Sequence, residues 1–153
     1  MKVLELKVPP VLLMLIFAIA IWFSQPLLPQ VIQPSTATLI VALVLMFAGI
    51  LIALLGVYAF KKAQTTVDPT KPDASSSLVS SGIYQLTRNP MYVGFSLCLA
   101  AFSVYLASPF SLFLVVLFGW YLTRFQIMPE ERILQGIFGQ PYQDYCQQVR
   151  RWL

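Results

Sequence analysis

Histidine is absent from this sequence, and charged residues are few. Of the 153 residues, 10% are charged and 58% are hydrophobic, whereas a typical soluble domain is about 25% charged. No charged residue lies between Lys7 and Lys61, or between Arg88 and Arg124. A water-soluble fold of this size exposes most of its residues and could not hide two such stretches. The sequence therefore excludes a soluble enzyme and a disordered chain.

The absence of histidine also removes the usual general base and the commonest metal ligand. The two cysteines, Cys98 and Cys146, lie far apart, the first in an apolar run and the second in a polar tail. They form no zinc pattern and give no reason to expect a disulfide, so we interpret both as small apolar filler. The basic residues behind the net charge of +4 are too few and too scattered to bind nucleic acid. We expect neither a metal site nor a nucleic-acid partner.

Long apolar runs fill most of the chain, and a membrane-spanning helix needs about 20 such residues. Pro9 and Pro10 suit a helix start, and no small-x-small cleavage site follows the first run, so we interpret it as a span rather than a signal peptide. We predict an all-α fold, an integral membrane helical bundle that forms a single membrane domain over residues 1–153, with an N-terminal helical hairpin over residues 10–60. The four predicted transmembrane helices are Pro10 to Leu28, Leu39 to Phe60, Pro90 to a turn at Ser108-Pro109, and from there to about Met128.

The fourth predicted span takes Arg124 into its cytoplasmic end. The charge-free stretch 89–123 holds 35 residues, and two separate spans would need about 40, so the fourth helix must continue beyond Arg124. An arginine at that depth either extends to the lipid headgroups or faces a site. The sequence leaves both interpretations open.

Small residues follow one face of the second span, at Ala42, Gly49, Ala53 and Gly56. Such a stripe lets two helix backbones approach closely. We interpret it as a packing surface rather than a binding site. It would also permit a homodimer.

The basic residues predict the orientation of the bundle. Four spans put both termini on one side, and the loops on the other side carry no charge. The positive-inside rule then places both termini in the cytoplasm, and we expect a bacterial or archaeal inner membrane. The basic residues on the cytoplasmic side are Lys2, Lys7, Lys61, Lys62, Lys71, Arg88, Arg132, Arg150 and Arg151.

The polar tail is predicted to form two short helices. Pro129 fits a first helical position, and Glu130 and Glu131 fit a first turn, while Gly139 can end that helix. Pro141 then opens a second helix, whose apolar stripe is Tyr142, Tyr145, Cys146 and Val149. We expect both helices to lie on the membrane surface or to cap the bundle.

Two polar clusters face the predicted cytoplasmic side. In the first, Arg88 precedes a helix start, where free N–H groups favour an anion, Asn89 can cap that helix, and Gly94 lets another group approach the backbone. This pattern also fits an ordinary helix start with an interfacial arginine. The second cluster runs from Glu130 to Trp152, and by itself it also fits helix capping by two carboxylates.

Together the two clusters resemble a known family. The strings are Gly82-x-Tyr84-x-x-x-Arg88-Asn89-Pro90-x-Tyr92-x-Gly94 and Glu130-Glu131-x-x-Leu134-x-x-x-Phe138-Gly139-x-x-Tyr142-x-x-Tyr145-x-x-x-Val149-x-Arg151. Both resemble motifs of the isoprenylcysteine carboxyl methyltransferases, which are related to the phospholipid methyltransferases. These are integral membrane enzymes that use S-adenosylmethionine. The resemblance covers about Ser81 to Trp152, so we expect residues 81–153 to be a methyltransferase-like half. This sequence departs from the family at Asn89, where many members have histidine.

The resemblance implies that cofactor contacts come from both motifs, brought together at the cytoplasmic membrane surface. Glu130 and Glu131 would take the ammonium or ribose hydroxyls of the cofactor, and tyrosines would supply aromatic faces for the adenine and the sulfonium. The residues expected to bind S-adenosylmethionine are Tyr84, Asn89, Pro90, Tyr92, Gly94, Glu130, Glu131, Tyr142 and Tyr145.

The missing histidine indicates the kind of methyl acceptor. A carboxylate is already ionised at neutral pH, because its pKa lies near about 4, so it needs a positioning cation rather than a base. Arg151 matches the C-terminal arginine of the family and is our first candidate for that catalytic role, with Arg88 second. The acceptor would be a lipophilic small molecule or a lipid-modified substrate that enters from the membrane lipid.

Two other functions stay open on the sequence alone. One is an NADPH-dependent membrane reductase of the sterol-reductase type, although the short tail offers little room for that nucleotide. The other is a non-catalytic membrane scaffold. A small multidrug exporter is disfavoured, because none of the predicted spans contains the acidic residue that such transport needs.

Overall fold

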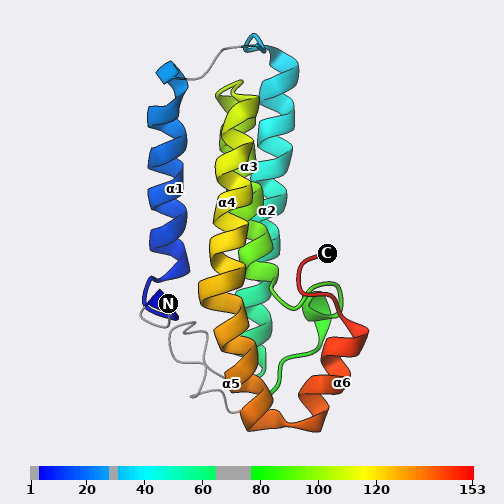
Figure 1. Ribbon diagram of the computed structural model, residues 1–153. Coiled ribbons are helices and arrows are strands. Elements are labelled where there is room, and N and C mark those ends of the chain that lie inside the picture. Colours follow the sequence, from blue (N-terminus) through cyan, green and yellow to red (C-terminus); the bar gives the residue numbers. More distant parts are fainter. Residues whose placement is uncertain (1–3, 28–30, 65–76) are drawn as a thin grey trace.

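The computed structural model describes residues 4–27, 31–64 and 77–153, and this part of the chain contains helices and no β-strands. The long helices stand side by side (Figure 1), and both termini lie in the same half of the molecule. The predicted all-α bundle is therefore confirmed. The helices are α1 (Pro10–Ser24), α2 (Thr36–Lys62), α3 (Pro90–Tyr105), α4 (Leu112–Leu122), α5 (Met128–Phe138) and α6 (Gln140–Gln148).

Three helical segments are long and apolar enough to cross a membrane: Pro10–Leu27, Thr36–Lys62 and Pro109–Phe138. The segment Pro90–Tyr105 is apolar but shorter. Its 16 residues correspond to about 24 Å at 1.5 Å each, less than the roughly 30 Å of a bilayer core. It is short because Pro90 begins it and Ala107, with a φ of 50°, turns the chain just after its end. The charge-free stretch 89–123 is too short for two full spans, and the structure accommodates this by making Pro90–Tyr105 the short helix.

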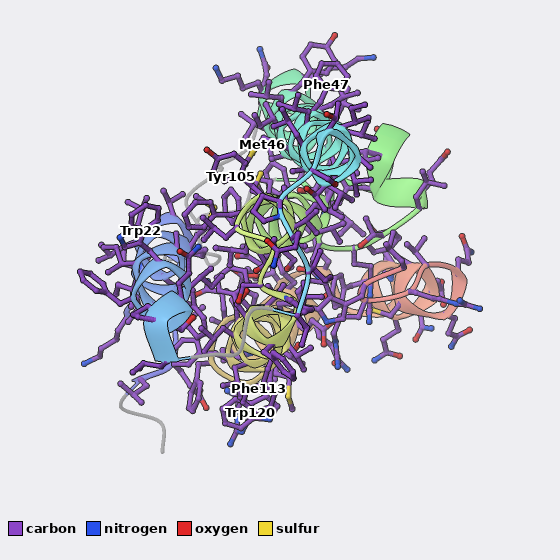
Figure 2. The ribbon with its side chains drawn as sticks, turned by 90° about the horizontal axis from the view of Figure 1, so that it is seen from above. Trp22, Met46, Phe47, Tyr105, Phe113 and Trp120 are labelled. Atoms are coloured by element: carbon purple, nitrogen blue, oxygen red, sulfur yellow. The ribbon has the colours of Figure 1, made fainter. Side chains whose placement is uncertain are left out.

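Helix α3 lies in the centre of the bundle and contacts α1, α2 and α4, as the view from above shows (Figure 2). On the outer side, Phe47 of α2 and Phe113 and Trp120 of α4 point away from the bundle and are largely exposed. Apolar exposure on this scale is typical of a lipid-facing surface rather than of a soluble monomer.

The predicted packing stripe on α2 is confirmed. Its buried residues are Ala42, Gly49 and Gly56, and the two glycines face α3. A Cβ atom added at Gly49 would lie 2.8 Å from the carbonyl oxygen of Gly94, and one added at Gly94 would lie 2.5 Å from that of Gly49, so glycine is required on both helices. Because α3 covers this stripe, it is not available as the contact surface of a homodimer, and a homodimer stays a prediction.

Helix α5 begins at Met128 with Pro129 in its first turn, as predicted, but it is not separate from the fourth span. Helix α4 continues without a break into α5 through a π-helical segment, Thr123–Ile127, and the two helices form one long rod in Figure 1. The N–H of Met128 donates to the carbonyl of Thr123, five residues earlier. Such a wide turn lets the helix accept Pro129, which has no N–H and would clash in a regular α-turn.

Helix α6 turns back from the end of α5 and runs beside the segment that precedes α3 (Figure 1). Gly139 ends α5 with a φ of 57°, as predicted. The expected apolar stripe of α6 is also confirmed, because Tyr142, Tyr145 and Val149 form a buried cluster with Leu134 and Phe138. This cluster fixes the tail against the bundle.

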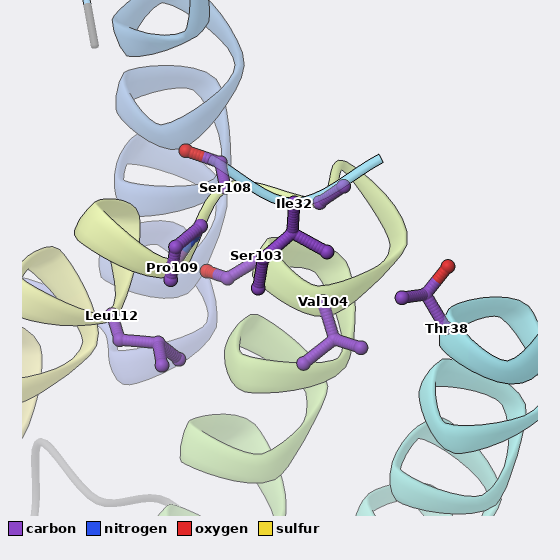
Figure 3. Close-up of a pocket in the computed structure, with 8 residues that line it drawn as sticks. Ile32, Thr38, Ser103, Val104, Ser108, Pro109 and Leu112 are labelled. Carbon is purple, nitrogen blue, oxygen red and sulfur yellow. The ribbon is translucent and has the colours of Figure 1, made fainter. Parts of the chain in front are cut away.

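A small cavity of about 120 Å³ lies at the end of the bundle away from both motifs (Figure 3). Apart from serine and threonine its lining is aliphatic, and it carries no charge, so it offers no chemistry for catalysis. Its lining residues are Ile32, Thr38, Ser103, Val104, Ala107, Ser108, Pro109 and Leu112.

Candidate active site

The two sequence motifs meet at the end of the bundle where α3 begins. The backbone N–H of Arg88 donates to the carbonyl of Arg150 at 3.0 Å, so the segment before α3 and the C-terminal segment lie side by side. The hydroxyl of Thr87, which is almost completely buried, donates to the carbonyl of Arg151 at 3.3 Å. These bonds clamp residues far apart in sequence into one site.

Asn89 takes part in this clamp rather than capping α3. It occupies the N-cap position, but its side chain makes no capping hydrogen bond. Its Nδ2 instead donates to the carbonyl of Arg151 at 2.9 Å. The predicted capping role is therefore wrong: a cap needs the side-chain oxygen to accept from an N–H of the first turn, whereas the bond to Arg151 holds the side chain through its Nδ2.

The Glu131 carboxylate binds both arginines that the sequence nominated for the acceptor. Nε and Nη2 of Arg151 donate to its two oxygens at 3.0 and 2.7 Å, and Nη2 of Arg88 lies 3.1 Å from Oε1. Arg88 and Glu131 are 12% and 18% exposed, whereas Arg151 is 37% exposed. Hydrogen bonding to Glu131 raises the pKa of Arg151 above its usual value. Three parts of the chain thus meet at one carboxylate.

Glu130, the neighbouring acid, has a different environment. The hydroxyl of Tyr92 and Nε2 of Gln126 both donate to Oε1 of Glu130, at 2.8 and 2.7 Å. Tyr92 and Gln126 are buried. Sequence reasoning overlooked Gln126, although its position four residues before Glu130 is the spacing at which helical side chains meet. The paired acids of the motif are therefore not equivalent: Glu131 forms ion pairs, and Glu130 accepts hydrogen bonds from neutral groups.

Three predicted tyrosines pack into the interior. Tyr84, Tyr142 and Tyr145 are buried, and the hydroxyl of Tyr145 donates to the carbonyl of Tyr84 at 2.7 Å. The ring of Tyr84 meets Phe60 edge to face, with centroids 5.4 Å apart. Burial raises the pKa of all three phenols, so they stay protonated. Their present contacts join the first motif to α6 and α2.

Pro90 and Gly94 lie on the side of α3 that faces α2. A Cβ added at Gly56 would lie 3.3 Å from Cγ of Pro90, and Gly94 contacts Gly49 and Ala53. The side chains of Tyr92 and Asn89 therefore lie at the polar cluster around Glu130 and Arg151. Pro90 and Gly94 instead pack against α2.

Cys146 is not mere filler, because Nη1 of Arg88 donates to its Sγ. The guanidinium of Arg88 thus contacts Cys146 and Glu131 at once. Its third nitrogen, Nε, is buried and has no hydrogen-bond partner among the described residues. A buried, unpaired donor on a charged group is costly, and it marks a place where a ligand oxygen would be favourable.

Arg124 faces neither carboxylate of this cluster. Its Nη1 lies 3.7 Å from Oε1 of Glu5, and its guanidinium lies over the ring of Phe125, 5.8 Å from the centroid. Within residues 4–27, 31–64 and 77–153 there is also no group of three acidic, cysteine or histidine side chains that could hold a metal ion.

Removal of the Glu131 charge should destabilise the fold. In Glu131→Gln the two guanidinium groups lose their shared partner, at a cost of about 1–3 kcal/mol. The ion pair with the half-exposed Arg151 contributes the smaller part of this free-energy cost, because water screens it. The matched control is Asp144→Asn, which alters an exposed hydrogen bond to Gln140 and should change stability by less than about 0.5 kcal/mol. Thermal unfolding of both variants in detergent measures this difference, and equal midpoints would contradict it.

Comparison with known proteins agrees with the resemblance seen in the sequence. The model of the phospholipid methyltransferase family matches residues 37–141, which is more than half of the chain. The probable protein-S-isoprenylcysteine O-methyltransferase of Oryza sativa subsp. indica is 31% identical over 113 residues, covering 74% of this chain and 59% of that protein. Protein-S-isoprenylcysteine O-methyltransferase B of Arabidopsis thaliana is 35% identical over 72 residues, covering 47% of this chain and 36% of that protein.

The Saccharomyces cerevisiae protein-S-isoprenylcysteine O-methyltransferase is 29% identical over 108 residues, covering 66% of this chain and 45% of that protein. The chain thus spans about three fifths or less of the length of these relatives. No solved structure matches it. The match over most of the helical bundle shows that this chain belongs to the phospholipid methyltransferase family.

Proposed function

We propose that this protein transfers a methyl group from S-adenosylmethionine to a lipophilic acceptor, at a carboxylate, on the cytoplasmic surface of the membrane. The observation that carries the proposal is the meeting of both motifs at Glu131, which binds Arg88 and Arg151 together. Relatives named as isoprenylcysteine O-methyltransferases support the reaction type.

The residues of the site fit the charges of the cofactor. S-adenosylmethionine supplies a methyl group on a cationic sulfonium, and its amino-acid end carries an ammonium and a carboxylate. The buried and unpaired Nε of Arg88 would donate to that carboxylate. The hydrogen bonds that Glu130 accepts from Tyr92 and Gln126, within the described part of the chain, end on Oε1. Its Oε2 would accept from the ammonium or a ribose hydroxyl.

The two arginines of the cluster support a carboxylate acceptor. Two guanidinium groups meet one carboxylate at Glu131, so an acceptor carboxylate placed beside these arginines would form further charge-assisted hydrogen bonds. Arg151 is the more exposed arginine of the two and is the one that an acceptor arriving from the lipid would meet. No histidine exists to remove a proton, and a carboxylate at neutral pH has none to remove.

The orientation in the membrane is part of the same proposal. The site lies at the end of the bundle that carries Arg88, Arg132 and Arg151, and the positive-inside rule assigns that end to the cytoplasm of a bacterial or archaeal inner membrane. Single cysteines at the exposed residues Gln33 and Ser80, in a chain lacking Cys98 and Cys146, test it. An impermeant thiol reagent outside the cell should label Gln33→Cys and spare Ser80→Cys, and the reverse pattern would overturn the orientation.

Cofactor binding should depend on Glu130. In Glu130→Gln the site keeps its shape but loses a charge-assisted hydrogen bond to the cofactor. We expect S-adenosylhomocysteine to bind about ten- to a hundred-fold more weakly, as measured by calorimetry in detergent. Asp144→Asn, on the exposed face of α6, is the control and should bind normally. Unchanged affinity in Glu130→Gln would mean that this carboxylate serves only the hydrogen bonds with Tyr92 and Gln126.

Transfer should depend on the planar fork of Arg151. Lysine keeps the charge but cannot hold a carboxylate through two parallel hydrogen bonds, so Arg151→Lys should slow turnover about ten-fold or more while binding of S-adenosylhomocysteine changes little. The assay uses a radiolabelled methyl donor with a lipid extract. The labelled product should be released by mild base, as an ester is, and a base-stable product would refute the carboxylate assignment.

A further inference from the structure

The N-terminal segment docks at the point where the long α4–α5 helix is interrupted. In a regular α-helix the carbonyl of Phe125 would accept from the N–H of residue 129, but residue 129 is proline and has none. The N–H of Leu6 takes that place and donates to the Phe125 carbonyl at 3.0 Å. A residue at the start of the chain therefore satisfies a defect that Pro129 creates.

Glu5 holds the same segment in place on both sides of the interruption. Its carboxylate contacts Arg124 at 3.7 Å and also contacts Arg132. Arg124 lies inside the π-helical segment and Arg132 lies in the first turns of α5. The side chain of Glu5 is only 14% exposed. Residues 5 and 6 thus bridge the two halves of the interrupted helix.

The π-helical segment decides which way the paired acids face. Each residue of an α-helix turns it by about 100°, and a π-turn accommodates one extra residue, so α5 is rotated by about that angle relative to an uninterrupted helix. Glu130 and Glu131 follow the segment directly. In this rotation Glu130 meets Tyr92 of α3, and Glu131 meets Arg88 and Arg151.

We propose that Glu5 and the N–H of Leu6 are positioning residues of the active site, because they hold the π-turn that directs Glu130 and Glu131 towards their partners. The inference rests on the proposed function only for what the site binds. The positioning itself concerns contacts within this chain and can be tested without any ligand.

Three variants separate the contacts. Leu6→Pro removes the N–H and cannot adopt the φ of 57° that Leu6 has. Leu6→Gly keeps the N–H and adopts this φ freely, so it is the matched control. Glu5→Gln keeps the shape of the side chain but removes the charge that faces Arg124 and Arg132.

The ligand-free readout is the reactivity of Cys146, which Arg88 contacts while Arg88 is held by Glu131. In a Cys98→Ser background, a membrane-permeant maleimide should label Cys146 about ten-fold faster in Leu6→Pro, and several-fold faster in Glu5→Gln, than in the parent or Leu6→Gly. Cys98, which lies against Gly49 in the bundle, is the reporter of general loosening in a Cys146→Ser background. Its labelling rate should not change.

Pro129→Ala tests whether the two ends of the contact are coupled. The alanine supplies an N–H to the Phe125 carbonyl. In the Pro129→Ala background, adding Leu6→Pro should therefore change the labelling rate of Cys146 little or not at all. An equal effect in both backgrounds would overturn the proposal. So would equal acceleration at Cys146 and Cys98, which would show general loosening, or no acceleration at Cys146.

Binding of S-adenosylhomocysteine to the same variants keeps this inference separate from the proposed function. If the parent protein binds it, Leu6→Pro should weaken binding about ten-fold and Leu6→Gly should not. If the parent does not bind it, the proposed function fails, while the labelling rates still decide whether residues 5 and 6 position the cluster.

Discussion

The carboxylate of Glu131, shared by two guanidinium groups, is the contact on which the arrangement of the candidate active site depends. It joins α5, the segment before α3 and the C-terminal segment. The last two segments also meet through the hydrogen bonds of Thr87, Arg88 and Asn89. Because Arg88 is mostly buried and Glu131 is its acidic partner, the charge of Arg88 would be poorly stabilised there without that carboxylate. The two guanidinium groups, with the unpaired Nε of Arg88, are then what the site offers to an anionic ligand.

Much of the fold could be predicted because its signals are local. The apolar runs, the proline at the start of α3 and the glycine at the end of α5 each act within a few residues, and the structure has them where expected. The continuity of α4 and α5 could not be predicted in this way. Pro129 is an ordinary signal for a helix start. The helix continues past Pro129 because of the π-turn before this proline and the N–H of the distant Leu6.

The site shows the same division between local and distant information. The motifs identified most of the residues that meet, including Arg88, Tyr92, Glu130, Glu131 and Arg151, because their spacing resembles that of a known family. Spacing does not reveal which acid pairs with which base. The separate environments of the two glutamates depend on the π-turn before α5. The turn of Asn89 towards the C-terminal segment and the contact between Arg88 and Cys146 depend on how α6 folds back.

The central claim is that one cofactor contacts both motifs at once. Photo-cross-linking with S-adenosylmethionine labelled in its methyl group, followed by peptide mapping, tests it most directly. We expect label in two peptides, one from residues 82–94 and one from residues 130–151, with competition by unlabelled S-adenosylhomocysteine. Label confined to one of the two, or found instead around Ser108 at the opposite end of the bundle, would contradict a site built from both motifs.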